Sequence, residues 1–345
     1  MAWATPNRER RVLKAGHSSI AVTLPKPWAE AMNLRPGDLI VFDQNDDGTL
    51  YLKPAPPPGT ASAGVPYLVQ AHAFTTPGLL ERLVFGAYRV GYDAIEIRTE
   101  VPMSAERLEE LQQAARRLLG VSVVAQEPTR IVLQNFIDPS KYGLPQLVQR
   151  MKMILVALIE EAETVLHRGR TKRPTALAEE TNRVIALLVR QLSLASRDWS
   201  LARRIGSPDA RQLLEWRVVV HALEELGTLL GEVLRELQEA AVPPRGDVSA
   251  LPALLEQFKG ELKAVVEELM HPSLPDAVDT FAETAQLAES ARASARKLKS
   301  GARKTGVYAA TIALGRGADA LAFLAQVALD RAVCSGTGAV ISSQH

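Results

Sequence analysis

Cysteine is almost missing from this sequence of 345 residues, which contains Cys334 and no other. A single cysteine excludes an internal disulfide and a zinc site built from several cysteines, and it fits a reducing compartment. We expect Cys334 to be a small apolar residue packed on a terminal helix. Long apolar runs are also missing, since the longest clean one, Met153 to Ile159, is far shorter than the ~20 residues that span a bilayer. The N-terminal residues lack the apolar core of a signal peptide. We therefore expect a cytoplasmic protein with no membrane insertion.

An excess of charge of one sign is missing as well. The 40 basic and 39 acidic residues leave a net charge of +1, so a nucleic-acid interface must come from a local patch. The six histidines are scattered along the chain, and none accompanies a nucleophile in a loop signature. No glycine-rich phosphate loop is present either. Because a hydrolase or transferase needs a nucleophile, a base and oxyanion donors that converge, we predict that the chain is not an enzyme.

Residues 8–53 read as short strands around one small helix, roughly Pro25 to Met32. In the predicted strand Ser19 to Leu24, alternation places Ile20, Val22 and Leu24 on one face and Ser19, Ala21 and Thr23 on the other. The segment Asn45-Asp46-Asp47-Gly48 is a strong hairpin signal. Such a small unit buries little apolar surface, so we expect it to need a partner copy.

The rest of the chain changes character twice, and the whole is predicted to be a multidomain α+β protein. Residues 54–64, rich in proline and glycine, form an interdomain linker. Residues 65–138 alternate between strand and helix patterns and predict a small α/β domain. Residues 140–334 predict an all-α domain of six helices, with breaks at 167–174, 206–208, 242–247, 271–275 and 300–306. Three helices on each side of the central proline-glycine break suggest two stacked three-helix bundles.

The N-terminal region also carries a local basic patch. Across residues 1–28 the net charge is +4, and two-fold pairing would double it and let opposed copies contact neighbouring phosphates. We expect the first strand to carry four of the five cations and the second strand to add short hydroxyl donors. The predicted DNA-binding residues are Arg8, Arg10, Arg11, Lys14, Ser18, Ser19, Thr23 and Lys26.

The segments Gly16-His17-Ser18-Ser19-Ile20-Ala21-Val22-Thr23-Leu24-Pro25-Lys26 and Leu34-Arg35-Pro36-Gly37-Asp38 resemble the AbrB/MazE/SpoVT swapped-hairpin family. The resemblance covers essentially all of residues 8–53. It implies that two chains interlace into one barrel that grips DNA, so a homodimer or a higher oligomer is expected.

Two helical segments, 179–192 and 315–332, resemble helices of PhoU-like proteins. The stretch that ends at Asn135-Phe136-Ile137-Asp138-Pro139 is similar to the middle region of archaeal-type phosphate uptake regulators, which join both modules. This resemblance implies a regulatory adaptor that couples a phosphate ABC transporter and a sensor histidine kinase to gene expression.

PhoU-like proteins often bind metal clusters through carboxylates four residues apart, because such carboxylates share a helix face. The pattern is damaged here: Thr228 stands four residues after Glu224, Gly315 stands four before Asp319, and Asn182 stands where an aspartate is expected. Solvated carboxylates on a helix surface are the plainer interpretation. We assign no cofactor, and keep metal ions on the helical domain open with four candidate ligands, Glu224, Asp279, Glu283 and Asp319.

Three functions remain open on the sequence. The first is a DNA-binding regulator of phosphate uptake and of phosphate-responsive transcription. The second is a dimeric interaction adaptor that docks to a sensor kinase or phosphate transporter without specific DNA binding. The third is an antitoxin-like partner protein, which the MazE resemblance suggests and the long helical domain disfavours.

Overall fold

The computed structural model describes residues 9–44, 48–55, 66–71, 76, 78–169, 171, 174–240, 250–297 and 306–335. The chain divides into two compact units between Ala63 and Gly64, inside the predicted linker, most of which lies outside the described residues. The fold class of a multidomain α+β protein is confirmed, since small sheets come first and helices follow. Each unit is described by itself below.

The first unit consists of two separate hairpins and one short helix. Its elements are β1 (Leu13–Ala15), β2 (Ser19–Ala21), α1 (Lys26–Ala31), β3 (Ile40–Gln44) and β4 (Leu50–Pro54). The pairs β1-β2 and β3-β4 are both antiparallel, and no strand joins one pair to the other among the described residues. Gly16 opens the connection after β1 with a φ of +77°, which suits a short hairpin loop with a left-handed glycine.

Two expectations about this unit were wrong in detail. The strand predicted to run to Leu24 ends at Ala21, because its partner β1 has only three residues to pair with. Arg10 and Arg11 precede β1 and do not lie on the first strand. Arg8 and the predicted turn residues 45–47 lie outside the described residues.

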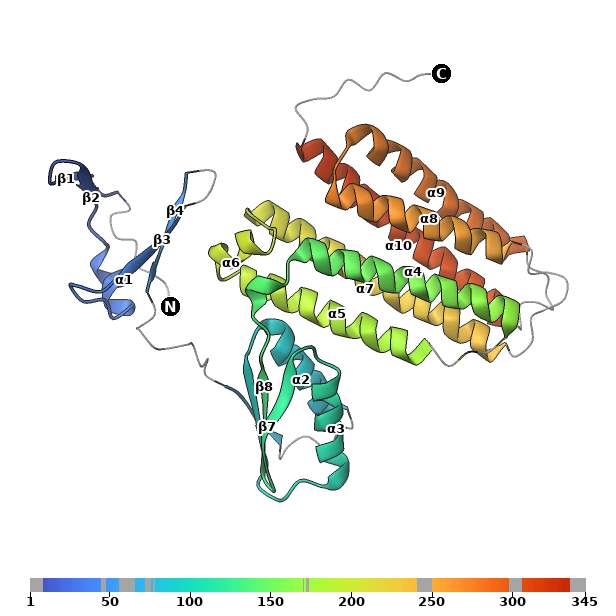
Figure 1. Cartoon of the computed structure of the whole chain (residues 1–345), viewed down its shortest axis with the longest axis horizontal. Coiled ribbons are helices and arrows are strands. Elements are labelled where there is room, and N and C mark those ends of the chain that lie inside the picture. Colours follow the sequence, from blue (N-terminus) through green and yellow to red (C-terminus); the bar gives the residue numbers. More distant parts are fainter. Residues whose placement is uncertain are drawn as a thin grey trace. The chain divides into compact units, whose positions relative to one another are not determined.

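The second unit begins with a four-stranded sheet in the order β5-β6-β8-β7 (Figure 1). β5 and β6 are parallel, while β6-β8 and β7-β8 are antiparallel. Alternating apolar residues such as Val69, Ile97 and Ile131 point to one face, where Leu80 and Leu111 of two helices cover them. The elements are β5 (Tyr67–Gln70), α2 (Leu79–Val90), β6 (Ala94–Arg98), α3 (Ala105–Arg116), β7 (Val121–Glu127) and β8 (Arg130–Asn135).

The rest of the second unit is a helical bundle around one continuous core. α4, α5 and α7 pack against one another, α8, α9 and α10 do the same, and contacts of α7 with α10 and of α4 with α8 join the groups. The apolar stripe of Leu254, Phe258 and Leu262 on α8 is buried in this core. The helices are α4 (Leu144–Arg168), α5 (Pro174–Ala195), α6 (Trp199–Arg204), α7 (Ala210–Glu239), α8 (Leu251–Met270), α9 (Leu274–Lys297) and α10 (Gly306–Ser335).

The described part of the bundle therefore contains seven helices where six were predicted. The additional break follows Ala195, where the predicted helix was expected to continue to Gly206. The Asp198 carboxylate accepts hydrogen bonds from the backbone N–H groups of Ser200 and Leu201. An aspartate that caps the first turn in this way starts a new helix, so α6 is separate from α5.

The last helix, α10, has an unusually apolar composition and corrects one further expectation, which concerns Cys334. An 18-residue stretch of this helix has a mean hydropathy of 1.4, which is enough for a helix able to cross a membrane, yet 61% of that stretch is buried inside the bundle. A core helix meets the same criteria, so the packing accounts for the composition without a bilayer. Cys334, expected to be packed, is exposed near the end of α10.

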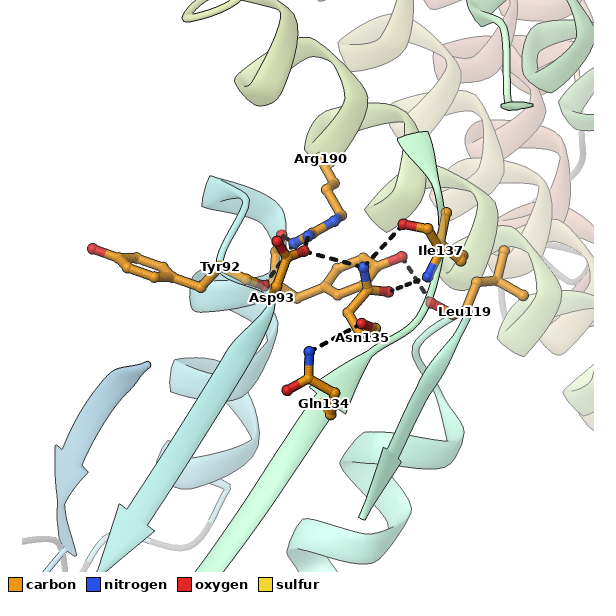
Figure 2. Close-up of polar contacts among 8 residues, drawn as sticks. Tyr92, Asp93, Leu119, Gln134, Asn135, Ile137 and Arg190 are labelled. Atoms are coloured by element: carbon orange, nitrogen blue, oxygen red, sulfur yellow. Dashed lines mark hydrogen bonds and ion pairs between the residues drawn. The ribbon is translucent and has the colours of Figure 1, made fainter. Parts of the chain in front are cut away.

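Arg190 of α5 joins the bundle to the sheet (Figure 2). Its side chain is 2% exposed, and it donates from Nη1 to the carbonyl oxygens of Tyr88 and Tyr92 at 2.8 Å each. Its Nη2 forms an ion pair with Asp93, and the guanidinium lies 4.9 Å from the Tyr88 ring centroid. Arg190 thus donates to backbone carbonyls where α2 ends, a place where helix carbonyls run short of partners, although the Tyr88 carbonyl also accepts from the Gly91 N–H at 3.0 Å.

Burial shapes the ionisation of this contact. Burial lowers the pKa of Arg190, and the charge of Asp93 opposes that effect. Burial raises the pKa of Tyr88 to about 12, and its hydroxyl donates to the Leu119 carbonyl at 3.0 Å. Arg190 is therefore a buried, paired cation that connects the α/β domain to the bundle within the second unit.

Candidate nucleic-acid interface

Of the predicted DNA-binding cations, the four that the structure describes, Arg10, Arg11, Lys14 and Lys26, are exposed to solvent, whereas Lys53 of β4 is half-buried. Arg10 and Arg11 lie on the segment before β1, Lys14 is the central residue of β1, and Lys26 is the first residue of α1. Lys26 contacts Glu30 at 3.7 Å, but their side chains are 87% and 67% exposed. Such a surface pair contributes little, so Lys26 can exchange Glu30 for a phosphate at small cost.

The strand register separates the predicted polar residues. Lys14 lies opposite Ile20, and Ala15 lies opposite Ser19. Residues directly opposite in an antiparallel pair share a face, so Lys14 and Ser19 lie on opposite faces of the hairpin. Ser18 is in the loop, and Thr23 is in the extended segment after β2. Within one chain the hydroxyl of Ser19 therefore does not share a face with the Lys14 cation.

Arg35 is an exposed cation that the predicted set omitted. It lies in the turn before β3, where its backbone N–H donates to the Asp38 carboxylate at 2.7 Å. Gly37 follows with a φ of +100°, a conformation that favours glycine. The Leu-Arg-Pro-Gly-Asp motif held the signal for this residue, because its aspartate and glycine fix the turn that presents the arginine.

The hairpin unit has no core of its own. None of the described residues between 9 and 55 is buried. Several large apolar side chains are mostly exposed: Ile20 at 77%, Leu39 at 76%, Val12 at 64% and Phe42 at 61%. Two-stranded hairpins are at best marginally stable alone, and apolar surface gathered on so small a unit indicates an interaction site. The cations of this unit are thus combined with a surface that requires a partner.

Of the four candidate metal ligands, Asp279 and Glu283 lie one turn apart on α9, while Glu224 and Asp319 lie on α7 and α10 and form ion pairs. Glu224 of α7 forms an ion pair with Arg89 of α2, and Asp319 of α10 forms one with Arg292 of α9. Glu283 is exposed on α9, and its charge contributes to raising the pKa of Glu261 on α8. Asp279 lies one turn before Glu283 on α9. Among the residues that the structure describes, no three histidine, cysteine, aspartate or glutamate side chains form a group able to hold a metal ion.

Comparison with known proteins identifies the first unit alone. Residues 13–60 match the family model described as "Antidote-toxin recognition MazE, bacterial antitoxin". This match supports the AbrB/MazE part of the resemblance drawn from the sequence, and no match supports its PhoU part. Searches of the curated proteins and of the solved structures found no match. The matched segment contains the loop after β1, all of α1 and both strands of the second hairpin.

Proposed function

We propose that this protein is a dimeric DNA-binding regulator whose MazE-type hairpin domain binds the DNA backbone. The observation that carries the proposal is a unit without buried residues that combines exposed apolar side chains with exposed cations. The match of residues 13–60 to the MazE model supports it independently.

Pairing of two copies accounts for both features of the unit. Side chains such as Ile20 and Leu39 are exposed in one chain, and burying a large apolar side chain contributes about 1.5–3 kcal/mol. The same pairing doubles the number of cations on one assembly. Lysine and arginine that neutralise phosphates release counterions, which supplies most of the sequence-independent affinity for DNA. Base-specific recognition then rests on the groups around these backbone contacts.

The signal that we propose is phosphate supply, received by the helical domain in the cytoplasm without catalysis. Its support is the order of the modules, with PhoU-like helical segments after a hairpin domain, and the grouping of the long helices into two sets of three. In this proposal the bundle binds a sensor histidine kinase or a phosphate transporter, and the hairpin domain passes the signal to a promoter.

The proposal is tested by capture of genomic DNA fragments at near-physiological salt. Full-length protein is compared with a variant that lacks residues 1–64, because only the first unit is removed. We expect the full-length protein to enrich promoters of phosphate-transport genes and the shortened protein to enrich none. Equal recovery by both proteins would refute a DNA interface in the hairpin unit. Selective enrichment of unrelated promoters would retain DNA binding and reject the phosphate signal.

The basic residues can be tested together. Replacement of Arg10, Arg11 and Lys26 by alanine should weaken DNA binding and flatten its salt dependence. The slope of the log binding constant against log salt is negative, and its magnitude should decrease by about 0.9 for each phosphate that is no longer neutralised. A matched control replaces Arg116, Arg197 and Arg217, three exposed arginines of the second unit. An unchanged slope in the first variant, or an equal reduction in the control, would place the DNA interface elsewhere.

An antitoxin-like regulator is the second candidate, and the description of the matched family favours it. In that case the chain should copurify in a stable complex with a toxin, and the shortened protein should still hold the toxin through its second unit. A toxin that is bound and neutralised by the full-length protein would establish this function. If the protein captures no specific DNA and copurifies with no toxin, the remaining function is an interaction adaptor without specific DNA binding.

A further inference from the structure

A cavity of about 510 Å³ opens in the bundle where the two helix groups meet. Its wall combines the first turns of α4, the end of α8, Trp216 of α7 and Arg331 of α10. This volume falls within the range of about 300–1,000 Å³ that is typical of small-molecule sites. Most of the wall is apolar, with the side chains of Pro145, Met153, Trp216, Leu269 and Met270.

Arg331 is the unusual member of this wall. Its guanidinium lies 4.5 Å from the Trp216 ring centroid, and its Nη1 is buried without a hydrogen-bond partner. No hydrogen bond or ion pair joins Arg331 to another residue in the described part of the chain. Trp216 is itself fixed, being 2% exposed and donating from Nε1 to the Gly206 carbonyl at 3.2 Å. A guanidinium N–H without an acceptor is costly. Nη1 itself is covered by protein, but the Arg331 side chain lines the cavity, so a ligand there can approach its uncompensated charge.

The surrounding charges leave Arg331 without a local counterion. Glu215 attracts it, but the Glu215 carboxylate accepts a 2.9 Å hydrogen bond from Arg211. Arg150, the other arginine of the wall, forms an ion pair with Glu180. Burial lowers the pKa of Arg331, yet an arginine stays protonated in proteins. Among the described residues that line the cavity, none is acidic.

We propose that this cavity binds a small organic acid, with its carboxylate on Arg331 and its apolar body against Met153, Leu269 and Met270. One unpaired guanidinium matches one carboxylate, and the planar fork of arginine suits that acceptor. The apolar wall offers little to a compact, strongly hydrated dianion such as inorganic phosphate. The site is separate from DNA binding by the first unit and does not depend on it.

The ligand series that tests the site consists of hexanoate, octanoate, octanol and inorganic phosphate, titrated calorimetrically into the full-length protein. We expect octanoate to bind more tightly than hexanoate, by about fourfold for each added methylene that is buried. We expect octanol to bind at least tenfold more weakly than octanoate, because it brings no charge to Arg331. These comparisons use the unaltered protein, so they do not depend on a variant that folds.

Two variants locate the binding on Arg331. Arg331→Gln should weaken octanoate binding at least tenfold and leave octanol binding unchanged. The matched control is Arg316→Gln on the same helix, because Arg316 is 61% exposed, contacts Glu232 at 3.4 Å and lies outside the cavity wall. The control should bind octanoate as the unaltered protein does. The proposal is overturned if octanoate does not bind, if octanol or phosphate binds as tightly, or if Arg331→Gln binds octanoate unchanged.

Discussion

The hairpin unit and the helical bundle of this chain differ in the solvent exposure of their apolar residues. In the bundle, Leu155, Phe258 and Leu314 are 0% exposed and belong to one continuous core. In the hairpin unit no described residue is buried, and Ile20 is 77% exposed. The bundle encloses its apolar residues within one chain, whereas the hairpin unit presents them to a partner.

This difference separates two sources of stability. Burial of apolar surface contributes roughly 25 cal/mol per Å², and the bundle gains it as soon as the chain folds. The hairpin unit can gain it only by association, which makes its stability depend on protein concentration. The following predictions test each side of this comparison, beginning with the largest expected effect.

Truncation of a core side chain should destabilise the bundle strongly. Phe258 of α8 is fully buried, and its ring packs against Gly317 of α10, where an added Cβ would lie 3.4 Å from the ring. Phe258→Ala should reduce the free energy of unfolding by about 3–5 kcal/mol, measured by urea denaturation. Phe323→Ala is the matched control, because Phe323 is 50% exposed and surface changes cost under about 0.5 kcal/mol. Similar losses in the two variants would contradict the assigned core.

The contact through Arg190 should make the α/β domain depend on the bundle. Arg190→Met keeps much of the volume but removes the ion pair with Asp93 and the hydrogen bonds to the carbonyls of Tyr88 and Tyr92. We expect a loss of about 2–3 kcal/mol, with faster amide hydrogen exchange in α2 and β6 than in α10. Arg197→Met, at an exposed position nearby in sequence, is the control. Unchanged exchange in α2 would show that Arg190 does not join the two parts.

An exposed hairpin residue should behave as a buried one if the unit is completed by a second copy. Ile20→Ser should lower the stability of the hairpin unit by about 1–3 kcal/mol for each chain, seen as a lower and more concentration-dependent melting temperature. Val101→Ser is the comparison, since Val101 is 67% exposed in the second unit and should change stability by less than about 0.5 kcal/mol. Equal, small effects would mean that Ile20 stays in solvent.

Glu261 of α8 is a buried carboxyl in the bundle that lacks a full set of partners. It is 9% exposed, its Oε2 has no hydrogen-bond partner, and burial together with the charge of Glu283 raises its pKa. The folded state therefore keeps this proton at pH values at which the unfolded chain has released it. Stability should fall as pH rises from the ordinary carboxyl range through the raised pKa.

Glu261→Gln removes this pH dependence. The variant should be more stable than the unaltered protein by about 1 kcal/mol at pH 7. The difference should vanish below about pH 4, where the Glu261 carboxyl is protonated in both the folded and the unfolded state. Glu267→Gln on the same helix is the control, because the Glu267 side chain is 59% exposed. Thermal unfolding across pH measures both, and a destabilised Glu261→Gln protein at pH 7 would contradict the assignment.

The sequence predicts elements well where local signals mark their ends. Strands and helices alternate between residues 67 and 135 as the pattern of residues 65–138 indicates, and helix ends at glycine and proline breaks were found. The break between α5 and α6 was missed because Arg197-Asp198 contains neither glycine nor proline, and the capping by Asp198 shows only in three dimensions. The strand length of β2 was overestimated because the short partner β1, rather than the alternation, sets it.

Contacts between distant residues were beyond the sequence. Arg190 reaches carbonyls 98 and 102 residues earlier in the chain, and no local pattern indicates such a bond. The same holds for Arg331, whose position over Trp216 depends on the packing of α7 against α10. In the candidate interface the cations were recognised from composition, while the separation of Lys14 from Ser19 follows from a register that alternation alone does not reveal.

The central claim, that a second copy completes the hairpin unit, is tested most directly by sedimentation equilibrium at micromolar concentration. Full-length protein, the Ile20→Ser variant and the protein lacking residues 1–64 are compared at the same concentrations. We predict a dimer for the full-length protein, weaker association for Ile20→Ser, and loss of this association without residues 1–64. A full-length protein that sediments as a monomer would contradict the account.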